Sequence, residues 1–139
     1  MMREPKCRAF LGISSQSLEP NQISEALNLQ PDYVHDSTTP DLQGNRMQGL
    51  WQLHSTLDAS EPLENHLTDI LKKLAPARQI FKDAIKGCQA GFYCSVEYSA
   101  PGVDGFSLSP RIMTLIGSLG IELHIDTWLE EEASDSLAL

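Results

Sequence analysis

The chain has 139 residues, of which 41% are hydrophobic and 21% are charged. This balance is typical of a globular domain and excludes a disordered one. No apolar run approaches the roughly 18 residues that cross a bilayer, and the N-terminus lacks the apolar core of a signal peptide. We therefore expect a cytoplasmic protein with a single domain over 1–139, an ordered core over about 7–128 and an acidic tail over 129–139.

The formal net charge of −9 is distributed unevenly along the chain. Residues 1–86 hold 11 acidic and 9 basic residues, whereas residues 87–139 hold 8 acidic residues and a single base, Arg111. The second half would repel a phosphate backbone, so we expect no binding of nucleic acid. With no spanning segment, a membrane partner is not expected either.

Two stretches with the same pattern, Ser17–Leu29 and Ser107–Leu119, organise the chain. Each begins Ser-Leu-x-Pro and continues with apolar residues at helical spacing, which predicts a helix with proline in its first turn. Each also follows one strand-like run and precedes another. The repeat therefore predicts two βαβ halves.

The remaining elements follow from local patterns. Alternation of apolar and polar residues predicts four strands, over 7–14, 47–54, 92–98 and 121–128. Between the second and third strands, Ser60 and Pro62 predict the start of a helix that reaches Leu74, and a shorter helix covers 80–85. Residues 30–46 show no periodicity and predict a long loop.

These elements predict an α+β fold, a ferredoxin-like sandwich with a four-stranded, mainly antiparallel sheet and helices over one face. The two helices between the second and third strands are an insertion in this plan. A helical pair can return the chain in the opposite direction, so we expect these two strands to be antiparallel. Trp51 is expected in the core beside Leu53.

The strand face away from the helices is the candidate functional surface. It collects aromatic, aliphatic and ionisable side chains that are too apolar for ordinary solvent-exposed surface: Arg8, Phe10, Leu50, Gln52, His54, Tyr93, Glu97, Glu122, His124, Asp126 and Trp128. Such a face suits a dimer interface or a shallow ligand site. We favour a homodimer, because paired open sheets bury a face of this kind.

Some of these residues are of types that bind metals or take part in catalysis. Histidine and carboxylate suit zinc or manganese, but no ligand spacing such as H-E-x-x-H is present. Asp126 could orient the imidazole of His124, yet the thiol of Cys94 points to the opposite face and Ser95 lacks a G-x-S-x-G context. We therefore predict no catalytic residues, no metal and no cofactor.

The helical insertion carries the one basic patch of the sequence, made of Lys72, Lys73, Arg78, Lys82 and Lys86. Positive charge near the C-terminus of a helix complements its dipole, so a structural role is favoured over a binding role. The two remaining histidines, His35 in the long loop and His66 on a helix, are predicted to be surface residues.

Several motifs lie at core positions, turns and strand ends: F-x-G-I-S-S at 10–15, L-x-P-x-x-I-x-x-x-L-x-L-x-P at 18–31, G-L-W-x-L at 49–53 and L-G-I-x-L-x-I-D-x-W at 119–128. Their order resembles a bacterial domain-of-unknown-function family of small α+β proteins, in which tyrosine often replaces Trp128. The resemblance covers the chain from about Cys7 to Trp128. It implies a compact α+β domain and supplies no activity, cofactor or catalytic residue.

Taken together, these patterns predict a non-enzymatic interaction or regulatory domain that forms a homodimer through its open sheet face and could bind a protein partner. Small size and acidic charge would suit an immunity-type inhibitor of a basic toxin. The alternative is a small-molecule sensor that binds a metabolite on the open face or beneath the 30–46 loop. A metal-dependent enzyme is the third hypothesis.

Overall fold

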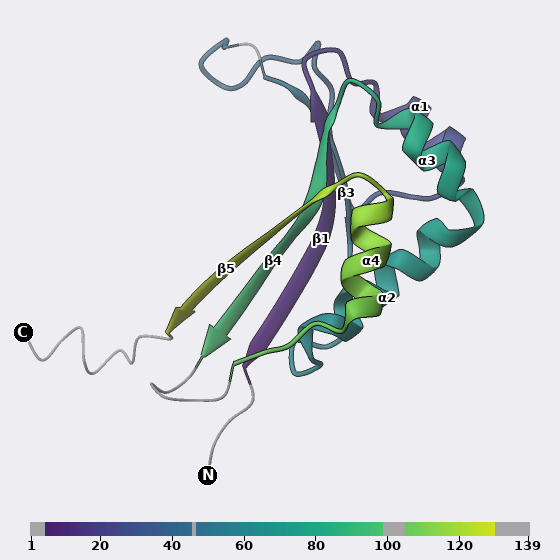
Figure 1. Cartoon of the computed structure of the whole chain (residues 1–139). Coiled ribbons are helices and arrows are strands. Elements are labelled where there is room, and N and C mark those ends of the chain that lie inside the picture. The colour runs from purple at the N-terminus through teal and green to yellow at the C-terminus, as the bar shows by residue number, and fades with distance from the viewer. Residues whose placement is uncertain (1–4, 46, 99–104, 130–139) are drawn as a thin grey trace, which may run out of the picture.

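The computed structural model describes residues 5–45, 47–98 and 105–129, which fold into a sheet with helices on one side (Figure 1). The strands are β1 (Lys6–Ser15), β2 (Tyr33–His35), β3 (Gly49–His54), β4 (Gln89–Tyr98) and β5 (Glu122–Leu129). The helices are α1 (Pro20–Leu27), α2 (Leu63–Leu74), the 3-10 turn η1 (Ala75–Ala77), α3 (Arg78–Ala84) and α4 (Pro110–Ser118). The α+β prediction is confirmed. Apart from Leu129, the predicted acidic tail lies outside the described residues.

The sheet is mixed, with its five strands in the order β2-β3-β1-β4-β5. The central strand β1 pairs antiparallel with both β3 and β4, and β2 pairs antiparallel with β3. Among the paired strands that the structure describes, only β4 and β5 are parallel, and α4 connects them. This connection is a βαβ unit, as the second copy of the helix pattern predicts.

The prediction of four strands is wrong, because β2 lies inside the predicted loop 30–46. Its three residues are too few to show an alternating pattern, and they form a strand by pairing with β3. The first predicted βαβ half is wrong in its second strand, since β1 and β3 are antiparallel neighbours and the strand that follows α1 in the same direction as β1 is β2. Finally, β3 and β4 are not antiparallel to each other: both run opposite to β1, which lies between them.

Local sequence explains where the helices begin and end. Pro20 stands in the first turn of α1, and Ser109 caps α4 by accepting a hydrogen bond from the backbone N–H of Ile112. Gly120, which follows the α4 cap residue Leu119, takes a positive φ of 73°, where a side chain would be strained. Ser60 is not the cap of α2, because its hydroxyl donates to Asp58 and the helix begins further on, at Leu63.

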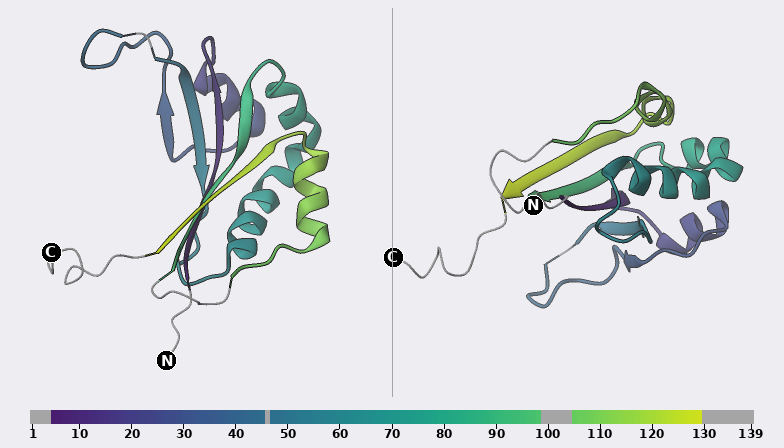
Figure 2. Two further views of the ribbon diagram at one scale, coloured as in Figure 1. Left: turned by 60° about the vertical axis from the view of Figure 1, so that its left-hand side comes forward. Right: turned by 90° about the horizontal axis from the view of Figure 1, so that it is seen from below.

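Figure 2 shows from two further directions that the helices cover one face of the sheet, and the core residues lie between these two layers. Alternate residues of β1, β3 and β4 point into it, including Leu11, Trp51 and Phe92. The Trp51 side chain is fully buried, and its indole Nε1 donates to the hydroxyl of Ser24 on α1 at 3.0 Å. Trp51 therefore joins the sheet to α1, in the core position that the sequence predicts.

Candidate functional site

The strand register brings four rings into one row on the face of the sheet away from the helices. His54 on β3 is opposite Phe10 on β1, which is opposite Tyr93 on β4, which is beside His124 on β5. Successive ring centroids lie 5.0, 5.3 and 4.7 Å apart, and the interplanar angles are 18°, 20° and 1°. We call this strip of stacked rings the aromatic row.

A glycine leaves room for the stacked rings of the aromatic row. A methyl group added at Gly12 would lie 3.1 Å from Cε2 of Tyr93 and 3.4 Å from Cε2 of Phe10. The distance to Tyr93 is shorter than an ordinary carbon contact, so the Tyr93 ring occupies the space that a side chain at position 12 would fill. Covering a strand glycine with a neighbouring aromatic ring also stabilises the sheet.

The two histidines at the ends of the aromatic row are each held by the residue two positions earlier on the same strand. Nε2 of His54 lies 2.9 Å from Oε1 of Gln52, and Nε2 of His124 lies 3.1 Å from Oε2 of Glu122. The carboxylate that contacts His124 is thus Glu122 rather than Asp126, the predicted partner. These contacts fix the plane of each terminal ring against its neighbour.

Beside the aromatic row, two further rows cross β1, β4 and β5. The register aligns Arg8 with Ser95 and Asp126, and Lys6 with Glu97 and Trp128. Arg8 and Asp126 are exposed, and 48% of the Trp128 surface is accessible. The face thus carries cations on its central strand, and an acid and an exposed tryptophan on its edge strand.

The β3 side of the same face carries Leu50 and Gln52, both half-buried. The register places Tyr33 beside Gln52 and His35 beside Leu50. Half of the Tyr33 surface is exposed, whereas His35 is partly buried and its Nδ1 lies 3.2 Å from the carbonyl oxygen of Gln48. The sequence pattern misses Tyr33 as a face residue because it does not predict β2.

A second candidate site is a groove of about 470 Å³ between α2 and α4, on the helix side of the molecule. Of the predicted basic patch, only Lys72 and Arg78 line it, and Arg111 of α4 joins them. Lys73 instead contacts Asp69 at 3.8 Å. Sequence reasoning misses this site, because it forms only when helices far apart in the chain pack together.

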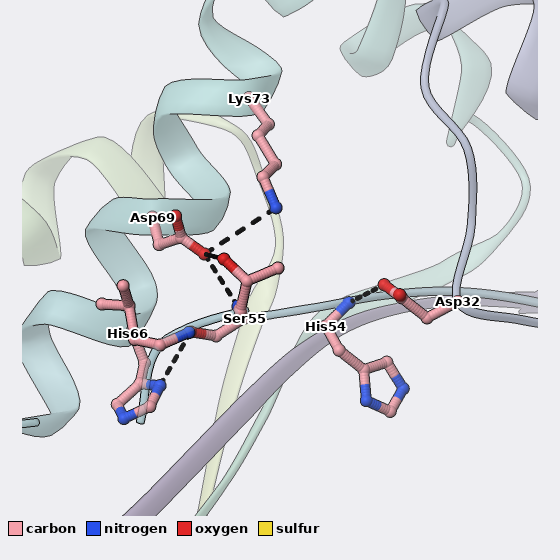
Figure 3. A network of polar contacts seen from close by, with 8 residues as sticks. Asp32, His54, Ser55, His66, Asp69 and Lys73 are labelled. Carbon is pink, nitrogen blue, oxygen red and sulfur yellow. Dashed lines mark hydrogen bonds and ion pairs between the residues drawn. The ribbon is translucent and has the colours of Figure 1, made fainter. Parts of the chain in front are cut away.

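His66 is buried, not a surface residue as predicted: only 1% of its surface is accessible. His66 lies on α2 next to Leu67. The buried face of this helix includes His66 and is therefore wider than the spacing of its apolar residues predicts. Its Nδ1 is 2.7 Å from the hydroxyl oxygen of Ser55 (Figure 3). Within the part of the chain that the structure describes, its Nε2 has no hydrogen-bond partner.

The Ser55–His66 pair belongs to a network that attaches the segment after β3 to α2 (Figure 3). Burial would raise the pKa of Asp69, but the backbone N–H of Thr56 at 3.0 Å and the ammonium of Lys73 outweigh it and lower the pKa. A serine nucleophile needs a histidine that is itself oriented by a carboxylate. No such group contacts Nε2 of His66 among the described residues, so the network is best explained as structural.

Cys94, considered as a nucleophile from the sequence, is also poorly suited to catalysis. Burial, together with the nearby thiol of Cys7, raises the pKa of Cys94 to about 12. At neutral pH the group is therefore a protonated thiol rather than the reactive thiolate. Over residues 5–45, 47–98 and 105–129, no three metal-binding side chains converge. In the same ranges, no helix has the length and apolar character needed to span a bilayer.

A family model described as a domain of unknown function, DUF4279, matches residues 5–130. The chain belongs to this family. The match confirms the resemblance to a domain-of-unknown-function family, and it spans every described element from β1 to β5. The aromatic row and the groove therefore both lie within the DUF4279 domain. No curated protein and no solved structure matches the chain.

Proposed function

We propose that this DUF4279 domain works by binding rather than catalysis, and that its open sheet face pairs with a second copy. The aromatic row carries the proposal. Rigid rings bury a large apolar area at a small cost in side-chain entropy, which is why they dominate protein interfaces. Here the stacked rings cross four strands in one continuous row, and such a row can pack against another sheet.

A ferredoxin-like plan is our inference for the fold beneath this face. Its support is the strand order β2-β3-β1-β4, in which every neighbour is antiparallel, with helices in the β1–β2 and β3–β4 connections. In this description α4 and β5 are an addition at one edge. The addition supplies His124, Asp126 and Trp128 to the face.

The charges on the face favour one arrangement of the two copies. Consider two sheets stacked face to face, with a two-fold axis between them that runs parallel to β4. Because β1 and β5 flank β4, β1 of one copy would then lie over β5 of the other. Arg8 would then face Asp126 of the second copy, and Lys6 would face the ring of Trp128. Opposite charges and a cation over an aromatic ring both favour this docking.

A charge swap tests the arrangement. Arg8→Glu and Asp126→Arg should each weaken the dimer by about tenfold, because each places like charges opposite one another twice in a symmetric pair. The double variant should associate nearly as tightly as the wild type, since it restores opposite charges. Sedimentation equilibrium measures the dissociation constants. Both side chains are exposed, and a thermal melt of each variant checks that the fold is intact.

Lys82→Glu is the matched control, because it reverses a charge on α3, on the side of the sheet away from the proposed interface. It should leave dimerisation unchanged. Single reversals without effect would contradict the proposed docking. The proposed docking would also be contradicted if the loss of dimer affinity in the double variant equalled the sum of the losses in the two single variants.

A reducing cytoplasmic location is part of the proposal. Its support is that Cys7, Cys88 and Cys94 are all free thiols, with Cys7 and Cys94 buried. Proteins of oxidising compartments more often use cysteines in disulfides. Labelling with a thiol reagent under native conditions, immediately after cell lysis, should modify Cys88 first.

A further inference from the structure

The groove between α2 and α4, two helices labelled in Figure 1, has the size and lining of a small-molecule site. Its volume of about 470 Å³ falls within the range of roughly 300–1,000 Å³ seen for ligand pockets. Its floor is apolar and consists of Leu71, Leu74, Ile112, Leu115 and Leu119. Leu74, Ile112 and Leu119 are buried in the core, whereas 36% of the Leu115 surface is exposed. A ligand could therefore cover apolar surface that water now contacts.

Three cations from three helices stand around this floor: Lys72 of α2, Arg78 of α3 and Arg111 of α4. All three are exposed, and none forms an ion pair with another residue in the described ranges. Other lysines of the same helices do, since Lys73 contacts Asp69 and Lys86 contacts Asp83. In a chain of net charge −9, this gathering of unpaired cations distinguishes the groove from the rest of the surface.

The helix dipole does not account for Arg111. It is the second residue of α4, and the N-terminus of a helix carries partial positive charge, so a cation there is unfavourable unless something else compensates. Arg78 differs, because it is both the cap at the C-terminal end of η1 and the first residue of α3, so the dipoles on its two sides oppose each other. An anion bound beside Arg111 would relieve the repulsion at the start of α4.

The other polar side chains of the groove, those of Glu64, Thr68 and Ser109, already form hydrogen bonds within the protein. The carboxylate of Glu64 accepts a hydrogen bond from the backbone N–H of Ser109, and the hydroxyl of Ser109 caps α4. The hydroxyl of Thr68 donates to the carbonyl oxygen of Glu64 at 2.9 Å. Glu64 therefore holds the start of α4 against α2. The lining of the groove has three positive charges and only this one negative charge. A ligand would meet positive charge above an apolar floor.

We infer that this groove binds a small amphipathic anion, with one apolar chain that ends in a carboxylate. An arginine guanidinium can donate two parallel hydrogen bonds to a carboxylate, which fixes the head group at the rim. The chain would lie along Leu71, Ile112 and Leu115 and remove apolar surface from water. The groove is on the opposite side of the sheet from the aromatic row, so the inference does not depend on the dimer.

Sodium decanoate is a suitable probe, with two matched compounds. Methyl NMR spectra of the full chain should show saturable shifts at Leu71, Ile112 and Leu115 as decanoate is added below its micelle concentration. Decyltrimethylammonium has an alkyl chain of similar length with the opposite charge, and acetate has the charge without the chain, so neither should saturate. The variant Arg78→Glu/Arg111→Glu should bind decanoate at least tenfold more weakly, whereas Lys82→Glu should bind it as the wild type does.

Several results would overturn the inference. They are an absence of saturable shifts with decanoate, equal affinity in Arg78→Glu/Arg111→Glu, or shifts centred on Phe10 and Tyr93 instead of the groove. Binding to anionic phospholipid vesicles without binding to monomeric decanoate would also overturn it, because the surface would then recognise a membrane. Both arginines are exposed, so thermal melts should show that the double variant keeps its fold.

Discussion

Replacing Trp51 with alanine is expected to destabilise the fold by about 3–5 kcal/mol. The Trp51 side chain is fully buried, and it is the largest of the fully buried side chains. Its removal leaves a cavity between the sheet and α1 and also breaks the hydrogen bond from the indole to Ser24. Because a domain of this kind is stable by only about 5–15 kcal/mol, the loss could leave little folded protein. Urea unfolding followed by far-ultraviolet circular dichroism measures the change.

Two milder variants separate packing from hydrogen bonding at this position. Ser24→Ala keeps the ring but leaves the indole N–H without its acceptor, which should cost about 1–3 kcal/mol. Trp51→Phe keeps most of the ring volume and should fall between Ser24→Ala and Trp51→Ala. A loss of less than about 1 kcal/mol in Trp51→Ala would show that this side chain does not anchor the core.

Gly49→Ala should destabilise the protein by about 3 kcal/mol or more, although it adds a single methyl group. That methyl carbon would lie 2.8 Å from Cβ of Leu18 and even closer to the carbonyl oxygen of Leu18. The obstacle is mainly backbone, at the turn that leads into α1, so it cannot move aside as a flexible side chain can. The same urea titration should show a lower unfolding midpoint with an unchanged slope.

Gly117→Ala is the matched control, because it makes the same substitution where there is room. Nothing lies within 4 Å of a methyl group added at Gly117, which is an exposed position inside α4. Since alanine favours the helix over glycine, this change should stabilise the protein by about 0.5–1 kcal/mol. The packing described at Gly49 would be contradicted if both substitutions shifted stability in the same direction by similar amounts.

The fold could be predicted from sequence as far as local patterns determine it. Alternation in Cys7–Ser14 and around Trp51 predicts both the strands and the side that each residue faces. The alternation gives no information about which strands pair, so it does not show that β1 lies between β3 and β4. The strand β2 escapes prediction because Tyr33–His35 is too short for a pattern and becomes a strand only by pairing with β3.

The same limit applies to the candidate sites. Alternation predicts that Phe10 and Tyr93 share a face with the two histidines, but their alignment into one row depends on the register between distant strands. His66 is misjudged because a polar residue on an amphipathic helix ordinarily faces water. Its burial depends on Ser55, which contacts it from the segment after β3.

Sedimentation velocity of the wild-type chain over a wide range of concentration tests the central claim most directly. If the open face pairs with a second copy, the protein should sediment as a dimer that dissociates on dilution. The Trp128→Glu variant should dissociate at higher concentration than the wild type, because it places a charge where an exposed ring would be buried. A wild-type protein that remains a monomer at every concentration would contradict the proposed function.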